Sequence, residues 1–189
     1  MALTRARVID VATSILRQYG LADLSMRRLA RELDVAPGAI YWHIANKQVL
    51  LAAVAERLLA DVPPAVAPAD DPAEATADVR PAPADDPAAV LRSHVVAVRD
   101  ALLPVPDGAD VVAIAYALDP ESAPALREIG VLLKEAGAQD VAATTDVVVH
   151  HILGSVAAVQ ARAASPDEAP TGPDRFEAGL DVVLDALAG

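Results

Sequence analysis

Side chains that can bind phosphate and reach base edges gather in one short stretch of this sequence. Tyr41 and His43 can donate to phosphate oxygens without adding charge, and Lys47 adds a cation. Two neighbouring arginines, Arg27 and Arg28, can reach either a base edge or the nucleic-acid backbone. This set of donors predicts a surface that binds nucleic acid.

Two short helices joined by a turn are expected to hold these side chains. Ser25 can cap a helix over residues 25–33, and Pro37 can open a second one over 37–43. This is the pattern of a helix-turn-helix, whose second helix enters the major groove of DNA.

The second of these helices must bury one face. Ile40 is expected to pack inward together with Trp42 or Ile44, and the pattern leaves open which of the two is buried. Tyr41 and His43 are then expected to face outward. The adjacent pair of aromatic residues is therefore predicted to have at least one member at the surface.

The positions expected to meet base edges offer almost no side-chain hydrogen bonds. They carry Ala36, Pro37, Gly38 and Ala39. Alanine or proline can touch a thymine methyl group, and glycine permits close approach. We therefore expect DNA sequence to be read through Arg27, methyl contacts and DNA shape.

The charge distribution agrees with this expectation although the whole chain is acidic. Its 189 residues carry a net charge of -12, which at first argues against a nucleic-acid partner. Residues 1–60 nevertheless hold eight Lys and Arg against five acids, or +3, whereas the remaining 129 residues hold seven against 22, or -15. A basic segment on an acidic body is typical of an anion-binding module attached to a regulatory body.

The rest of the sequence predicts an all-α fold. Hydrophobic residues make up 54% of the chain but aromatic residues only 3%, which favours a helical core of small and branched side chains. Apolar residues repeat at helical spacing throughout, and no strand pattern competes. The expected helices span residues 4–19, 25–33, 37–43, 47–61, 86–103, 107–118, 120–136, 139–164 and 174–188.

A proline-rich segment divides these helices into two domains. Residues 63–87 hold seven of the fifteen prolines, a density that no regular helix tolerates. We expect a DNA-binding domain over 1–61, a linker over 62–87 and a regulatory and dimerisation domain over 88–189. No cysteine, secretory signal or uninterrupted apolar run long enough to span a bilayer is present, which favours a cytoplasmic protein without a membrane partner.

The segment "LSMRRLARELDVAPGAIYWHIANKQVLLAAVAERLL" resembles the DNA-binding domain of the TetR (tetracycline-repressor-like) transcriptional regulators, and the resemblance covers residues 5–60. It implies that Arg27 reaches bases and that Tyr41, His43 and Lys47 contact phosphates. A homodimer would then read a palindromic operator in double-stranded DNA.

Residues 87–189 resemble the family's regulatory domain more weakly, in pieces such as "AVLRSHVVAVRDALL" and "VHHILGSV". The resemblance implies that the last two helices pair with those of a second copy in a four-helix bundle. The expected dimer residues are small ones that allow close helix approach and an apolar stripe on the last helix: Gly154, Ala158, Ala161, Phe176, Leu180, Val183, Leu184 and Leu187. These stripes can also close the core of the single chain, and both roles can hold together, with the dimer favoured.

The resemblance also places a small-molecule pocket in this domain. His94 falls at a position that contacts drug in the tetracycline repressors, whereas the positions of their metal contacts carry Val112 and Ala158, which cannot bind Mg²⁺. We therefore expect a largely apolar effector and no metal or other cofactor. The expected lining is His94, Val98, Leu102, Val112, Tyr116, Ile129, Leu133 and His150.

The leading hypothesis is a transcriptional repressor that its effector releases from DNA. An activator, or a repressor controlled by a protein partner, remains an alternative. A metal-binding protein or an enzyme that uses His94, His150 and Asp146 is a remote one. The sequence has no Glu-x-x-His pair, glycine-rich phosphate loop or nucleophile elbow, so we do not expect an enzyme.

Overall fold

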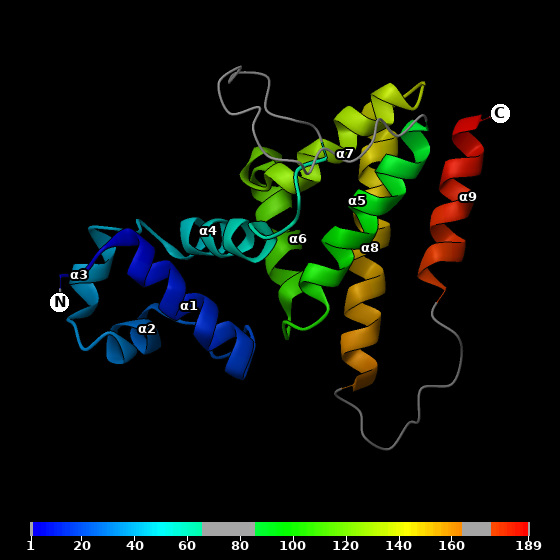
Figure 1. Cartoon of the computed structure of the whole chain (residues 1–189). Coiled ribbons are helices and arrows are strands. Elements are labelled where there is room, and N and C mark those ends of the chain that lie inside the picture. Colours follow the sequence, from blue (N-terminus) through cyan, green and yellow to red (C-terminus); the bar gives the residue numbers. More distant parts are fainter. Residues whose placement is uncertain (1, 66–85, 164–174, 189) are drawn as a thin grey trace, which may run out of the picture.

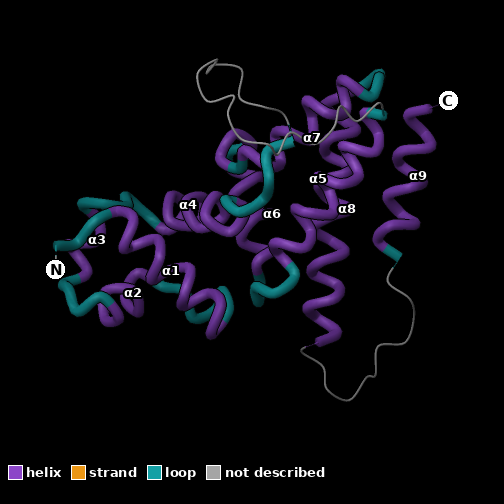
Figure 2. The backbone as a smooth tube through the Cα atoms, in the orientation of Figure 1, coloured by secondary structure: helices purple, strands orange, loops and turns teal. Residues whose placement is uncertain are grey.

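The computed structural model describes residues 2–65, 86–163 and 175–188, and the regular structure in these residues is entirely helical (Figure 2). The all-α fold expected from the sequence is confirmed. The helices are α1 (Arg5–Tyr19), α2 (Met26–Glu32), α3 (Pro37–Tyr41), α4 (Lys47–Leu59), α5 (Pro87–Leu102), α6 (Gly108–Leu118), the 3₁₀ turn η1 (Pro120–Ser122), α7 (Pro124–Glu135), α8 (Val141–Ala163) and α9 (Phe176–Ala188).

Local capping groups set most of the helix ends where the sequence predicts them. Ser25 accepts a hydrogen bond from the Arg28 amide at 3.2 Å, and Asn46 accepts one from the Val49 amide at 2.9 Å. Gly20 ends α1 with φ 77°, a left-handed conformation that glycine adopts without strain. These caps satisfy amides and carbonyls that the first and last turns of a helix leave free.

The expected helix over 120–136 is shorter in the structure. It begins at Pro124, and η1 precedes it as a separate turn. Ala123 is not helical, with φ -125° and ψ 84°, because the ring of a following proline disfavours helical backbone in the preceding residue. Most of the predicted linker, residues 66–85, lies outside the described residues.

Helix α4 joins the first three helices to the rest of the chain (Figure 1). It packs on α1 through one part of its surface and on α5 and α6 through another. Leu50 and Val54 are completely buried between these neighbours. A hydrogen bond from the Leu21 amide to Asp107 Oδ2, 2.7 Å long, links the two groups of helices a second time.

Helix α8 is the central helix of the second group and packs on α5, α6, α7 and α9. Among the described helices it is long and apolar enough to cross a membrane by length and composition alone. A core helix of a soluble protein meets the same criterion, and Val148, Val149 and Ile152 are completely buried against neighbouring helices. Only 28% of this apolar stretch is buried, however, so packing within this chain accounts for a minor part of its apolar character.

Candidate nucleic-acid interface

Helix α3 and the turn that follows it bury two isoleucines and expose the aromatic pair. Ile40 and Ile44 have no exposed surface, whereas Tyr41 is 51% exposed and Trp42 is 90% exposed. The possibility that Trp42 packs inward is therefore wrong, because Ile44 fills that place in the core. A fully exposed tryptophan beside an exposed tyrosine leaves a large amphipathic surface with two polar N–H and O–H groups.

The basic side chains near this pair come from α2 and α4. Lys47 is exposed in the first turn of α4, beside Asn46, and His43 is half-buried. Arg27 is exposed in the first turn of α2, and no carboxylate among the described residues pairs with it. Arg27, Tyr41, Trp42 and Lys47 thus all present donors to solvent.

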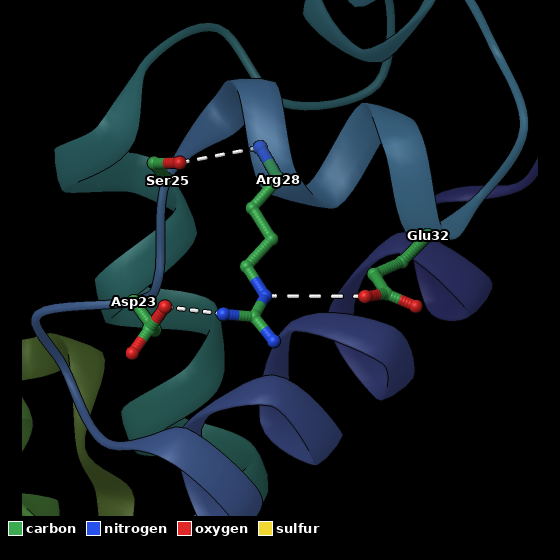
Figure 3. A network of polar contacts seen from close by, with 4 residues as sticks. All are labelled: Asp23, Ser25, Arg28 and Glu32. Atoms are coloured by element: carbon green, nitrogen blue, oxygen red, sulfur yellow. Dashed lines mark hydrogen bonds and ion pairs between the residues drawn. The ribbon is translucent and has the colours of Figure 1, made fainter.

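Arg28 has different surroundings from Arg27 (Figure 3). Its Nη1 atom is hydrogen-bonded and ion-paired to Asp23, and its Nε atom lies 3.9 Å from Glu32 Oε1, an ion-pair distance. Its guanidinium carbon lies 3.9 Å from the centre of the Tyr19 ring, so a cation–π contact adds to the network. The side chain is only 17% exposed. The structure places Arg28 inside the domain, whereas the sequence predicts it as a possible DNA contact.

The four residues expected at base edges form a smooth apolar surface. Ala36, Pro37 and Gly38 are exposed and Ala39 is half-buried. A Cβ atom built on Gly38 would meet no other atom within 4 Å. This part of α3 therefore has room for a side chain that the sequence does not supply.

The residues predicted to line an effector pocket form a packed core in this structure. Val98, Leu102, Val112, Ile129 and Leu133 are completely buried, with no surface that a water molecule can touch. These five side chains must separate before a ligand can lie between them. The predicted pocket is closed in this conformation.

The polar residues predicted for this pocket lie in three different surroundings. His94 is 4% exposed, and its Nε2 donates to the Ala125 carbonyl at 2.7 Å, since a carbonyl can only accept. Tyr116 donates to Asp146 Oδ1 at 3.0 Å. Burial, together with this hydrogen bond and the nearby carboxylate charge, raises the pKa of Tyr116 from 10.0 to about 12. His150 is exposed and donates from Nδ1 to the Asp146 carbonyl at 2.6 Å.

The residues predicted for the dimer interface divide into two groups. Gly154, Ala158 and Ala161 are exposed along one face of α8, where Val147 is also 53% exposed. The stripe on α9 instead packs on the chain's own core, with Phe176, Leu180 and Leu184 buried and Val183 half-buried. The Leu187 side chain lies outside the described part of the structure.

Sequence reasoning missed the outward face of α9. Val182 is 70% exposed there, and Ala178, one turn earlier, is exposed as well. Their spacing of four residues could have identified a second apolar face, but the stronger stripe through Phe176 and Leu180 concealed it. The exposure of Trp42 was the other feature that the pattern left undecided.

Comparison with known proteins places these features in a family. The sequence profile of the bacterial regulatory proteins of the tetR family matches residues 8–54. The class A tetracycline repressor from transposon 1721 of Escherichia coli is 32% identical over 206 aligned positions, which cover 96% of this chain and 88% of that protein. The chain belongs to the TetR family.

Matches to other TetR proteins differ in the share of each chain that they cover. The match to the class D tetracycline repressor of Escherichia coli is 41% identical but spans only 58 residues, 27% of that protein. The structure of BioQ with its natural double-stranded DNA operator is 35% identical with a TM-score of 0.76, and covers 100% of this chain and 99% of BioQ. A TetR variant from Acinetobacter baumannii in complex with minocycline is 26% identical with a TM-score of 0.71, and covers 98% and 93%.

TetR proteins are DNA-binding regulators and not enzymes, so the class of protein expected from the sequence is confirmed. The family resemblance over residues 5–60 is confirmed as well, because the matched segment lies within it. The helix-turn-helix of this TetR chain is formed by α2 and α3.

Proposed function

We propose that this TetR protein is a homodimeric transcriptional repressor that binds a palindromic operator and is released from it by a small, largely apolar effector. The observation that carries the proposal is the exposed surface formed by Tyr41, Trp42 and Lys47 at the junction of α3 and α4. Hydroxyl, indole and ammonium groups on neighbouring residues can all donate to phosphate oxygens. The DNA-bound structure of BioQ supports a DNA partner for a chain of this fold.

The outward faces of α8 and α9 support a dimer. Val147, Gly154 and Ala158 lie along one side of α8, and Val182 lies on the outer side of α9. Small residues on α8 allow a second helix to approach closely, and a partly apolar face gains free energy when it is covered. A second copy on this surface would give two recognition helices related by a twofold axis, which matches a palindrome.

The proposed effector binds where the core helices α5, α6 and α7 meet. The minocycline complex of the Acinetobacter protein supports a small-molecule ligand for a chain of this fold. The buried side chains between these helices are apolar apart from His94, whose Nε2 lies 3.9 Å from Glu128 Oε2. The His94 ring donates to the Ala125 carbonyl and can exchange that bond for one to a ligand. Because this core is closed, a ligand that fits it must favour a conformation in which the helices are further apart.

Helix α4 connects such a movement to DNA. It packs on both α1 and α6. A displacement of α6 therefore changes the orientation of α1–α3. The two recognition helices of a dimer must match the spacing of successive major grooves. An effector that prefers a different spacing lowers DNA affinity, and DNA lowers effector affinity by the same factor.

An activator, or a repressor that responds to a protein partner, would use the same DNA surface. No described residue favours either of these over the proposed repressor. We propose that the protein acts in the cytoplasm and that it needs no metal or other cofactor. Among the described residues, no group of three His, Asp or Glu side chains is arranged to hold a metal ion.

A salt titration of DNA binding tests the proposal. Wild-type protein, the Tyr41→Ala/Lys47→Ala variant and a Lys134→Ala control are compared by fluorescence anisotropy on a duplex selected from a random pool. Lys134 is the second of the two lysines and is exposed on α7, away from the helix-turn-helix. Each Lys47–phosphate contact that is removed should reduce the slope of log K against log salt by about 0.9, whereas loss of the uncharged Tyr41 hydroxyl should lower affinity without changing the slope. Equal slopes for all three proteins would refute the proposed surface.

A further inference from the structure

The surface of α3 that would face the major groove carries no side-chain hydrogen-bonding group. Ala36, Pro37 and Gly38 are exposed, Ala39 is half-buried, and none of these four has a polar side-chain atom. The backbone adds little, because proline has no N–H and the Ala39 amide already donates to the Ala36 carbonyl at 2.9 Å. The side chains of this surface can therefore recognise a base pair only through apolar contact and close approach.

Hydrogen bonding from α2 is restricted as well. Arg28 is held within the domain by Asp23, Glu32 and the Tyr19 ring, so its guanidinium is not available to DNA. Arg27 is exposed and can donate to a base edge. A single arginine in the first turn of α2 thus supplies what α3 lacks.

The thymine methyl group is the one apolar feature of the major groove. An apolar surface gains free energy when it covers this methyl group. The polar edges of both kinds of base pair lose water partners against this surface, so the methyl group is what distinguishes an A·T pair. Coverage of the methyl group therefore favours thymine at the positions that α3 covers.

We propose that this protein reads its operator chiefly through thymine methyl groups that Ala36, Pro37 and Ala39 contact, with Arg27 as the main hydrogen-bonding reader. The inference rests on the proposed function. Gly38 lets α3 approach the base edges more closely than a helix with a side chain at that position, because a Cβ there would project into open space rather than into the protein. The preferred half-site contains thymines opposite α3 and a purine within reach of Arg27.

Uracil substitution tests this inference on intact DNA. Sites are selected with wild-type protein from random duplexes, and each thymine of the selected half-site is then replaced by uracil, which removes only the methyl group. Covering one methyl group corresponds to about fourfold in affinity, so uracil at a contacted thymine in both half-sites should weaken binding by about 15-fold. Uracil outside the half-sites is the control and should change affinity by less than about twofold.

Substitution of Gly38 tests the same surface from the protein side. Gly38→Gln adds an amide that can bind adenine in a bidentate manner, and Gly38→Ala adds only a methyl group. Both fit the open space at this position, so the thermal midpoint should stay close to that of wild type. The glutamine variant should select a site with a new adenine preference and lose uracil sensitivity at that step, whereas the alanine variant should keep the wild-type site.

The outcomes separate this inference from the proposed function. If no sequence is enriched, and wild type binds no better than Tyr41→Ala/Lys47→Ala, the proposed function fails and the inference fails with it. If a sequence is enriched but uracil at every thymine of the half-site binds within about twofold, the function stands and methyl recognition is overturned. Loss of binding only at uracil-substituted half-site positions, together with a changed site for Gly38→Gln, supports the inference.

Discussion

Arg27 and Arg28 are neighbours in the sequence, but the fold gives them separate tasks. The hydroxyl cap of Ser25 starts α2 and turns Arg28 toward Asp23, Glu32 and the Tyr19 ring. Arg27, the preceding residue, is then exposed to solvent. A pattern of charges cannot reveal this division, since it depends on where α1 places Tyr19.

This division predicts opposite effects for two otherwise identical substitutions. Arg28→Ala should lower the free energy of unfolding by about 1–2 kcal/mol, because it removes an ion-pair network and a cation–π contact. Arg27→Ala should change stability by less than about 0.5 kcal/mol yet weaken DNA binding at least tenfold. Urea denaturation and anisotropy on the same samples measure both quantities. The reverse assignment of effects would contradict the positions described for the two side chains.

Tyr116 gives the protein a specific dependence on alkaline pH. Its pKa rises from 10.0 in an unfolded chain to about 12 in the fold, so the folded state favours the neutral phenol. Its contribution to stability is therefore complete below pH 10 and is lost as pH rises through about 12.

Tyr116→Phe should remove this loss, because phenylalanine does not ionise. Urea denaturation of both proteins at a series of pH values should show that the stability of wild type relative to the variant falls between pH 10 and about 12. Groups common to both proteins cancel in this difference. A difference that does not change across this interval would show that Tyr116 ionises as readily in the fold as in the unfolded chain.

Helix α9 docks on α8 through a close contact between one glycine and one histidine. The His151 ring stacks on Phe176 with 5.0 Å between ring centres, and its Nε2 donates to the Phe176 carbonyl at 2.9 Å. A Cβ atom on Gly179 would lie 2.4 Å from His151 Cε1. Both the stack and the hydrogen bond prevent the ring from moving aside.

Gly179→Ala should therefore lower stability by about 1–3 kcal/mol despite the better helix propensity of alanine. His151→Ala alone should also be destabilising, since it removes the stack and the hydrogen bond. The double variant should be more stable than the sum of the two losses predicts, because the removed ring leaves room for the methyl group. Urea denaturation at one protein concentration measures all three, and strict additivity would contradict the close contact.

Features set by nearby residues could be predicted from the sequence, and features set by distant ones could not. Ser25 caps its helix as expected, since a cap involves only the next few residues. The choice between Trp42 and Ile44 for the core depended on how the helices pack together, which no local pattern describes. The stripe through Phe176 was correctly identified as apolar. An apolar stripe in a sequence does not show, however, whether the same chain or a second copy covers it.

The first three helices are connected to the rest of the chain at more than one point. Helix α4 packs on α6, and the Leu21 amide donates to Asp107 Oδ2 at 2.7 Å. Gly20 makes this approach possible, because a Cβ there would lie 2.6 Å from the same oxygen. Asp107 itself has φ 54° and immediately precedes α6, so a displacement of that helix should break the hydrogen bond.

Substitution of Asp107 should show whether this hydrogen bond couples the two groups. Asp107→Gly removes the acceptor and tolerates φ 54°, whereas Asp107→Asn keeps an acceptor oxygen. A hydrogen bond to a charged group contributes about 1.5–3 kcal/mol, so hydrogen exchange at the Leu21 amide should accelerate at least about tenfold in the glycine variant. The asparagine variant should stay closer to wild type. Without this hydrogen bond, one connection between α1–α3 and α6 is lost, and effector should change DNA affinity by a smaller factor than in wild type. Unchanged exchange at Leu21 together with an unchanged effector response in Asp107→Gly would assign the coupling to α4 and α6 alone.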